Sequence, residues 1–92
     1  MKINFSNRFE KEFFEIYMYI AKDSFSNADN FKSELMSSMQ ILKDFPYMYR
    51  KSKKAKYKNL RNMIYKKYVI PYKIKENEIL ILGIFKKNLW KA

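Results

Sequence analysis

The chain has 92 residues and a formal net charge of +11, and it contains neither cysteine nor histidine. A chain of this length can bury one modest core, so residues 1–92 are expected to form a single domain. The missing residue types exclude a disulfide framework, a thiol nucleophile, an imidazole base and the usual zinc sites, and we expect no metal and no cofactor. No apolar run is long enough to span a membrane and no leader segment is visible at the N-terminus, which predicts a cytoplasmic protein.

Positive charge is concentrated in the second half of the chain. Residues 1–45 carry six basic and seven acidic side chains, whereas residues 46–92 carry fourteen basic and two acidic ones. The segment RKSKKAKYK, residues 50–58, holds six positive charges and no acid. This asymmetry predicts a polyanionic partner, such as nucleic acid, an acidic protein or a membrane surface. A lysine-rich composition that only keeps the protein soluble is the alternative, but it does not explain why only one half is basic.

The first half of the chain has the pattern of one strand followed by a helix. Residues 2–6 alternate between apolar and polar side chains, which predicts a short strand. Asn7, with Glu10 three residues later, forms a weak capping box and predicts that a helix begins there and extends over residues 8–22. Its apolar side chains recur at helical spacing and predict a core-facing stripe: Phe9, Phe13, Ile16, Tyr17 and Ile20.

A second helix follows after a short interruption. Ser26 and Asp29 match a helix start signal, and Pro46 predicts the end of the helix because the residue before a proline avoids the helical region. Five apolar residues predict the buried stripe of this helix: Ala28, Phe31, Leu35, Met39 and Leu42. The joint is short, so the two helices are expected to form an antiparallel hairpin.

After Pro46 the pattern changes to that of strands, expected at residues 60–66, 68–74 and 79–85. Pro71 lacks a backbone N–H, so one side of its strand should be unpaired or bulged. The last run is apolar on both faces, as in a central strand that is covered on both sides or packed against a partner. The order β-α-α-β-β-β predicts an α+β domain, with a helical hairpin packed on one face of a mainly antiparallel four-stranded sheet.

This order, together with several sequence phrases, resembles the RelE/ParE superfamily of toxins from bacterial type II toxin–antitoxin systems. EIYMYIAKDSFSNADNF (15–31) is similar to the ParE-like and plasmid-stabilisation branch. LKDFPYMYR (42–50) resembles the family segment L-x-x-F-P-x-x-G-R. YVIPYKI (68–74) and ILILGIFKK (79–87) resemble two of its strands, and Arg61 falls on the arginine that commonly opens its second strand.

The chain departs from the family pattern at positions that concern activity more than fold. Tyr49 stands in place of the glycine of the central segment. Val69, Phe85 and Lys87 occupy positions where family members commonly have arginine, histidine and arginine. Lysine is a point charge and does not form the bidentate phosphate contact of arginine, so Lys87 is an imperfect substitute.

The resemblance implies growth inhibition, and two mechanisms follow from its two branches. A ParE-like toxin poisons DNA gyrase by binding, which needs a cationic face and a shaped loop, and the helical phrases favour this branch. A RelE-like, ribosome-dependent mRNA endonuclease would need a base, a cation and an acid without histidine. For that mechanism the candidate catalytic residues are Lys54, Lys58, Arg61, Tyr68 and Lys87. A third hypothesis is a non-toxic nucleic-acid-binding module that combines tyrosine stacking with phosphate contacts.

The basic side chains of the second half are the expected target-binding surface, and the same field should attract the acidic segment of a cognate antitoxin. Family resemblance implies that the antitoxin wraps the toxin as a helix and an extended strand. The target would be DNA gyrase or the ribosome with its mRNA, and no membrane contact is expected. A merely solvated loop remains the alternative for residues 50–58. The predicted surface comprises Arg50, Lys51, Lys53, Lys54, Lys56, Lys58, Arg61, Lys66, Lys67, Lys86 and Lys87.

Overall fold

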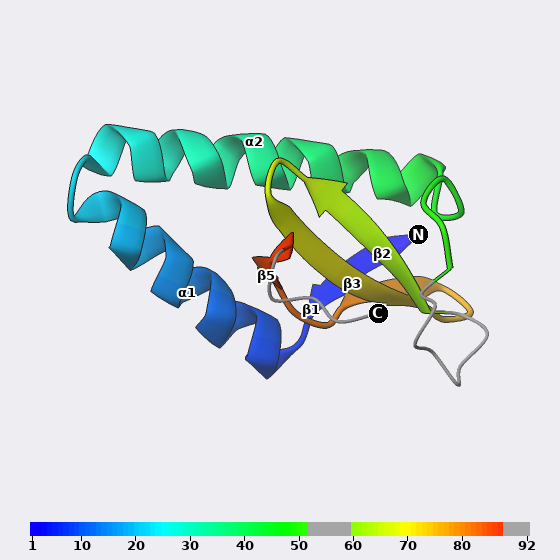
Figure 1. Cartoon of the computed structure of the whole chain (residues 1–92). Helices are drawn as coiled ribbons and strands as arrows, with labels where there is room; N and C mark the ends of the chain where they lie inside the picture. Colours follow the sequence, from blue (N-terminus) through cyan, green and yellow to red (C-terminus); the bar gives the residue numbers. More distant parts are fainter. Residues whose placement is uncertain (52–59, 88–92) are drawn as a thin grey trace.

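The structure is a computed structural model that describes residues 1–51 and 60–87. It confirms the predicted α+β architecture, with two helices packed on a mixed sheet (Figure 1). The elements in chain order are β1 (Lys2–Phe5), α1 (Asn7–Ala21), α2 (Phe25–Asp44), β2 (Leu60–Tyr65), β3 (Tyr68–Ile74), β4 (Glu78–Ile81) and β5 (Phe85–Lys86). Among these described residues, no helix is both long enough and apolar enough to cross a membrane.

The sheet is mainly antiparallel, as predicted, but it contains one parallel pair. Its strand order is β1-β4-β3-β2, with β5 paired to β3. β1 runs parallel to β4, and all other pairs are antiparallel. Parallel neighbours require a long connection, and here the two helices and the β2–β3 hairpin provide it. The N-terminal strand β1 therefore lies at one edge of the sheet, where it pairs with the inner strand β4.

Both helices begin earlier than the sequence predicts. The N-cap of α1 is Ser6 rather than Asn7, and the N-cap of α2 is Ser24 rather than Ser26. In each case the serine hydroxyl accepts a hydrogen bond from the backbone N–H three residues later, at 3.0 Å and 3.1 Å. Both serines have the extended backbone that an N-cap requires, whereas the two predicted caps already lie inside the helices.

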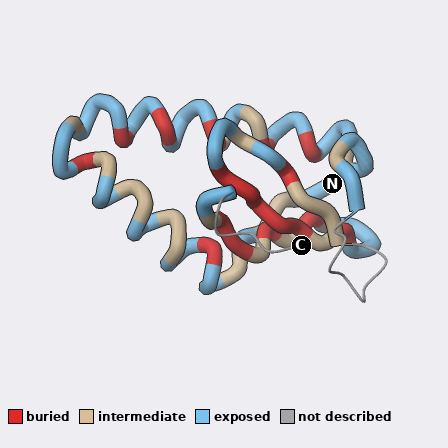
Figure 2. The backbone as a smooth tube through the Cα atoms, in the orientation of Figure 1, coloured by how far each residue is buried: buried red, intermediate tan, exposed pale blue. Residues whose placement is uncertain are grey.

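The core lies between α2 and one face of the sheet. All five residues of the predicted α2 stripe are buried, which confirms that periodicity. The α1 stripe is different, because Phe9 is buried while its other members are only half-buried. Figure 2 shows this contrast along the two helices, and Figure 1 shows that their joined end extends past the sheet. The C-terminal half of α1 therefore keeps part of its apolar face available.

The last predicted strand is divided in two, and the prediction of one strand over residues 79–85 is therefore wrong. Tyr72 of β3 pairs with Ile81 of β4, and Val69 pairs with Phe85 of β5. Two residues lie between Val69 and Tyr72 in β3, whereas three residues lie between Ile81 and Phe85. The segment that joins β4 to β5 therefore has one residue more than the part of β3 that it faces. Pro71 lies opposite this interruption, where its missing N–H costs no ladder bond. The expected interruption on one side of the Pro71 strand is confirmed.

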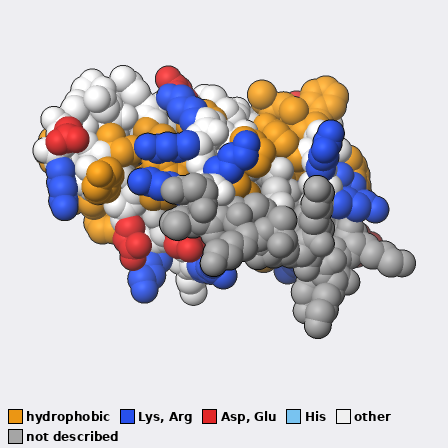
Figure 3. All heavy atoms as spheres, viewed as in Figure 1, with side chains coloured by type: hydrophobic (Ala, Val, Ile, Leu, Met, Phe, Trp, Pro, Cys, Tyr) orange, Lys and Arg blue, Asp and Glu red, His pale blue; other side chains and the backbone are white. Residues whose placement is uncertain are grey.

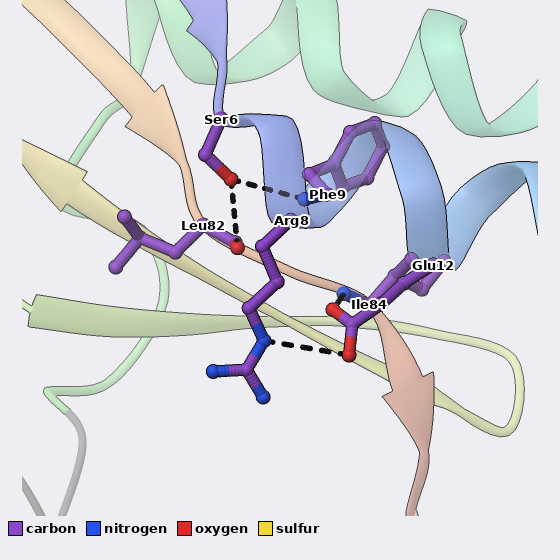
Figure 4. Close-up of polar contacts among 6 residues, drawn as sticks. All are labelled: Ser6, Arg8, Phe9, Glu12, Leu82 and Ile84. Carbon is purple, nitrogen blue, oxygen red and sulfur yellow. Dashed lines mark hydrogen bonds and ion pairs between the residues drawn. The ribbon is translucent and has the colours of Figure 1, made fainter.

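The start of α1 is attached to this bulge by two side chains (Figure 4). Ser6 donates its hydroxyl proton to the carbonyl oxygen of Leu82 at 2.9 Å. Glu12 accepts a hydrogen bond from the backbone N–H of Ile84 through Oε1 at 3.1 Å, and its Oε2 lies 3.4 Å from Nε of Arg8. Backbone groups that the interrupted ladder leaves unpaired are thereby satisfied by α1.

Candidate functional site

A shallow groove lies between the C-terminal half of α1 and the tip of the β2–β3 hairpin. It consists of two adjoining pockets of about 320 Å³ and about 230 Å³, and both are lined by Tyr19 and Tyr68. We call it the Tyr19–Tyr68 groove. Apolar side chains of the two helices, Ile16, Ile20 and Phe31, line its walls. The groove exists because α1 is incompletely covered by the sheet at this end.

Tyr68 is the more deeply buried of the two tyrosines that line the groove. Its ring packs against the ring of Phe31 with the centroids 5.3 Å apart, and only 4% of the residue is exposed. Burial raises the pKa of the Tyr68 hydroxyl, and the neighbouring Tyr19 raises it further. The hydroxyl therefore stays protonated near neutral pH, where it can donate a hydrogen bond but is a poor proton acceptor.

The hairpin tip is held in place by a carboxylate from α2. Lys66 has a φ of 52°, in the left-handed region that favours glycine, so this turn needs support from elsewhere. Glu34 provides that support, because its Oε2 accepts a hydrogen bond from the Tyr65 hydroxyl at 2.6 Å and lies 3.1 Å from Nζ of Lys66. The hydrogen bond from Tyr65, and then the ion pair, lower the pKa of the Glu34 carboxyl.

Cations from the β2–β3 turn and from β5 meet at the groove. Nζ of Lys67 lies 5.8 Å from the ring centroid of Tyr68, and Nζ of Lys86 lies 5.7 Å from that of Tyr19. The backbone N–H of Lys87 donates to the carbonyl oxygen of Lys67 at 2.6 Å, which joins the end of β5 to the hairpin tip. Figure 3 shows lysine and arginine side chains beside hydrophobic surface in this part of the molecule. The groove thus offers ammonium groups over an apolar floor.

The described residues of the predicted basic surface form two groups rather than one. They lie at opposite ends of β2 and β3, and a strand of six residues spans roughly 20 Å. The group at the hairpin tip consists of Lys66, Lys67, Lys86 and Lys87, and the group at the other end consists of Arg50, Lys51 and Arg61. The other predicted members lie outside the described residues: Lys53, Lys54, Lys56 and Lys58.

Arg61 is directed toward the backbone of its own chain. Its Nη1 donates to the carbonyl oxygen of Tyr49 at 2.7 Å, and its guanidinium carbon lies 4.8 Å from the ring centroid of Tyr47. This half-buried arginine therefore stabilises the connection between α2 and β2.

Sequence reasoning did not single out Tyr19, although a tyrosine on the polar side of an amphipathic helix is a usable signal of a binding surface.

The arrangement is suited to binding rather than to proton transfer. Tyr68 is held protonated, and Arg61 already binds a carbonyl oxygen. Within residues 1–51 and 60–87, no cluster of three or more acidic, histidine or cysteine side chains could hold a metal ion. Ammonium groups beside tyrosine hydroxyls and aliphatic side chains can instead hold a carboxylate or phosphate next to an apolar group.

Comparison with known proteins decides the family. The family model for the ParE toxin of the type II toxin–antitoxin system, parDE, matches residues 3–88. The chain belongs to the ParE toxin family. This membership confirms the resemblance inferred from the sequence, and it implies an antitoxin partner.

Two solved structures share the fold of this ParE-family chain. One is the chromosomal ParDE TA system from P. aeruginosa, with 16% identity, a TM-score of 0.74, and coverage of 94% of this chain and 95% of that chain. The other is the solution structure of the conserved hypothetical protein HP0894 from Helicobacter pylori, with 21% identity, a TM-score of 0.62, and coverage of 98% and 99%. No curated protein matches this chain in sequence. At these identities the two structures establish the fold alone.

Proposed function

We propose that this ParE-family toxin acts in the cytoplasm by binding DNA gyrase, and that a cognate antitoxin neutralises it. The observation that carries the proposal is the Tyr19–Tyr68 groove, where Lys67 and Lys86 lie beside an apolar floor. Lys66, which also lines the groove, is paired with Glu34, and Glu15 is the acidic residue of the lining. Such a surface can hold an acidic protein region by charge and by apolar contact together. The two groups of basic residues extend the positive field to both ends of the β2–β3 hairpin.

Binding is favoured over RNA cleavage by the state of the candidate catalytic groups. Cleavage through a 2′-hydroxyl needs a base whose pKa lies near the working pH. Tyr68 is shifted in the opposite direction, because burial raises the pKa of its hydroxyl. Arg61, another of the candidate catalytic residues, donates to the carbonyl oxygen of Tyr49. Poisoning gyrase requires no chemistry from these residues.

The antitoxin is expected to compete for the same groove. A chain with a net charge of +11 attracts an acidic segment over several ångströms, and the apolar floor favours a segment that also carries aliphatic or aromatic side chains. Occupation of the groove by the antitoxin would then exclude the target. Neutralisation would then follow from occupancy of the groove.

The test combines a gyrase assay with a charge-matched control. The purified toxin at micromolar concentration should inhibit supercoiling of plasmid DNA or trap cleavage complexes. The double variant K67E/K86E reverses two charges at the groove and should lose most of this effect. K11E/K32E makes the same change in charge on exposed helix positions outside the groove and should retain it. Circular dichroism and urea unfolding establish that both variants are folded.

Two results would refute the proposal. One is wild-type toxin that leaves gyrase unaffected while primer extension on mRNA in translating ribosomes reveals new cleavage, which would establish the nuclease. The other is equal loss of activity in the two charge variants, which would show that net charge matters and the groove does not.

A further inference from the structure

The connection between α2 and β2 presents a second apolar surface, far from the groove. Four large side chains at the end of α2 and in the following turn are 48–62% exposed. We call them the apolar turn: Ile41, Phe45, Tyr47 and Met48. They follow one another within eight residues of the chain, so their exposure is a property of one continuous segment. Large exposed apolar groups that occur together mark interaction surfaces more often than isolated ones do.

Side chains of β2 and β3 bind the backbone of this segment by hydrogen bonds. The Tyr72 hydroxyl donates to the carbonyl oxygen of Pro46 at 2.8 Å, and Nη1 of Arg61 donates to that of Tyr49 at 2.7 Å. The Arg61 guanidinium also covers one face of the Tyr47 ring, with its central carbon 4.8 Å from the centroid. The turn is therefore ordered before any partner arrives, which reduces the entropic cost of binding.

Positive charge surrounds the apolar turn. Lys43, Arg50 and Lys51 are exposed on either side of it, and Asp44 is the single acidic residue between positions 41 and 51. The backbone N–H of Asn62 donates to the carbonyl oxygen of Arg50 at 3.2 Å, which fixes the start of the basic segment beside β2. A partner that fits this surface must be acidic around an apolar centre.

We infer that the apolar turn is a docking surface for an acidic amphipathic segment of a protein partner. An apolar centre with a charged rim is the usual composition of a protein–protein interface. Nucleic acid fits less well, because Ile41, Phe45 and Met48 offer no hydrogen bonds to bases, and one face of the Tyr47 ring is already occupied. The Tyr19–Tyr68 groove lies at the other end of β2 and β3, so both surfaces can be occupied at once.

The experiment uses a defined probe. A fluorescein-labelled synthetic peptide of about five helical turns, with leucine and phenylalanine on one face and glutamate on the others, is titrated by fluorescence anisotropy. The full chain carries K67E/K86E in this experiment and in every variant below, so that the Tyr19–Tyr68 groove, which is also proposed to hold acidic segments, does not contribute to the affinity. We expect saturable binding that weakens as salt rises, because charge contributes. F45S/M48S should weaken binding about tenfold or more. F14S/M18S removes two comparably exposed apolar side chains from α1 and should leave the affinity unchanged.

A further double variant separates charge from apolar contact. R50E/K51E should also weaken peptide binding and should remove most of its salt dependence. All substituted side chains are exposed, and unfolding curves verify that the variants fold. The inference does not depend on gyrase as the target, because the readout is peptide affinity rather than supercoiling.

Several results would overturn this inference. Equal weakening by F45S/M48S and F14S/M18S would place the peptide elsewhere. Binding of single-stranded oligonucleotides or of phosphatidylcholine–phosphatidylglycerol vesicles that is lost in F45S/M48S, without peptide binding, would assign the surface to nucleic acid or to lipid. Dimers of the wild type that dissociate in F45S/M48S would assign it to a second copy of the chain.

Discussion

Gly83 lies in the bulge between β4 and β5, and the substitution G83A tests how α1 is attached to it. A Cβ built at this position would lie 2.6 Å from Oε1 of Glu12, closer than a carbon and an oxygen approach without displacement. Gly83 is not in the left-handed region, so alanine can adopt its backbone conformation. The obstacle is therefore a side chain that accepts the N–H of Ile84.

The expected cost follows from the bond that must break. If the Glu12 carboxylate moves aside, the buried N–H of Ile84 loses its acceptor, at a cost of about 1–3 kcal/mol. Replacing glycine by alanine stabilises a compatible site by about 0.4–1 kcal/mol through the unfolded chain. We therefore expect G83A to reduce the free energy of unfolding by about 1–2 kcal/mol.

The decisive measurement repeats G83A in a chain that already carries E12A. There the carboxylate is absent and the new methyl group has space, so G83A should be neutral or stabilising by up to about 1 kcal/mol. Urea unfolding, monitored by circular dichroism, gives the free energies of unfolding of the wild type, G83A, E12A and E12A/G83A, provided that all four proteins have the same m-value. An equal cost of G83A in both backgrounds would refute the reasoning.

Two further predictions concern pH. Burial raises the pKa of Tyr72 to about 12, so the stability that its neutral hydroxyl provides is complete below about pH 10 and falls by about 2–3 kcal/mol as pH rises toward 12. Y72F should lower stability by about 1 kcal/mol at neutral pH, through loss of the bond to Pro46, and should make the alkaline decline in urea unfolding smaller by about 2–3 kcal/mol. The pKa of Glu34 is lowered by its contacts with Tyr65 and Lys66, so its contribution is present at neutral pH and is lost as pH falls below the ordinary carboxyl range. E34Q should destabilise the chain at pH 7 and flatten the acid limb of its stability profile; an unchanged acid limb would mean that the ion pair does not stabilise the hairpin tip.

Features that depend on neighbouring residues in the sequence were predictable. The apolar period of α2 identified its buried stripe in full, because helical geometry alone decides which residues share a face. Pro71 indicated an interruption in the ladder, because no tertiary arrangement can supply its missing N–H. The family phrases led to the ParE toxin family, which the match over residues 3–88 established.

Features that depend on distant segments were decided by the tertiary structure. Ser6 caps α1 in place of Asn7, and its hydroxyl also bonds the carbonyl oxygen of Leu82, which is remote in the chain. The groove joins Tyr19 to Tyr68, and Arg61 binds a backbone carbonyl instead of facing outward. Local periodicity determines which side of a helix or strand is apolar, but only packing determines which sides meet. The sequence alone therefore indicated the order of the elements and the family, and only the packing of α1 beside the hairpin tip created the Tyr19–Tyr68 groove.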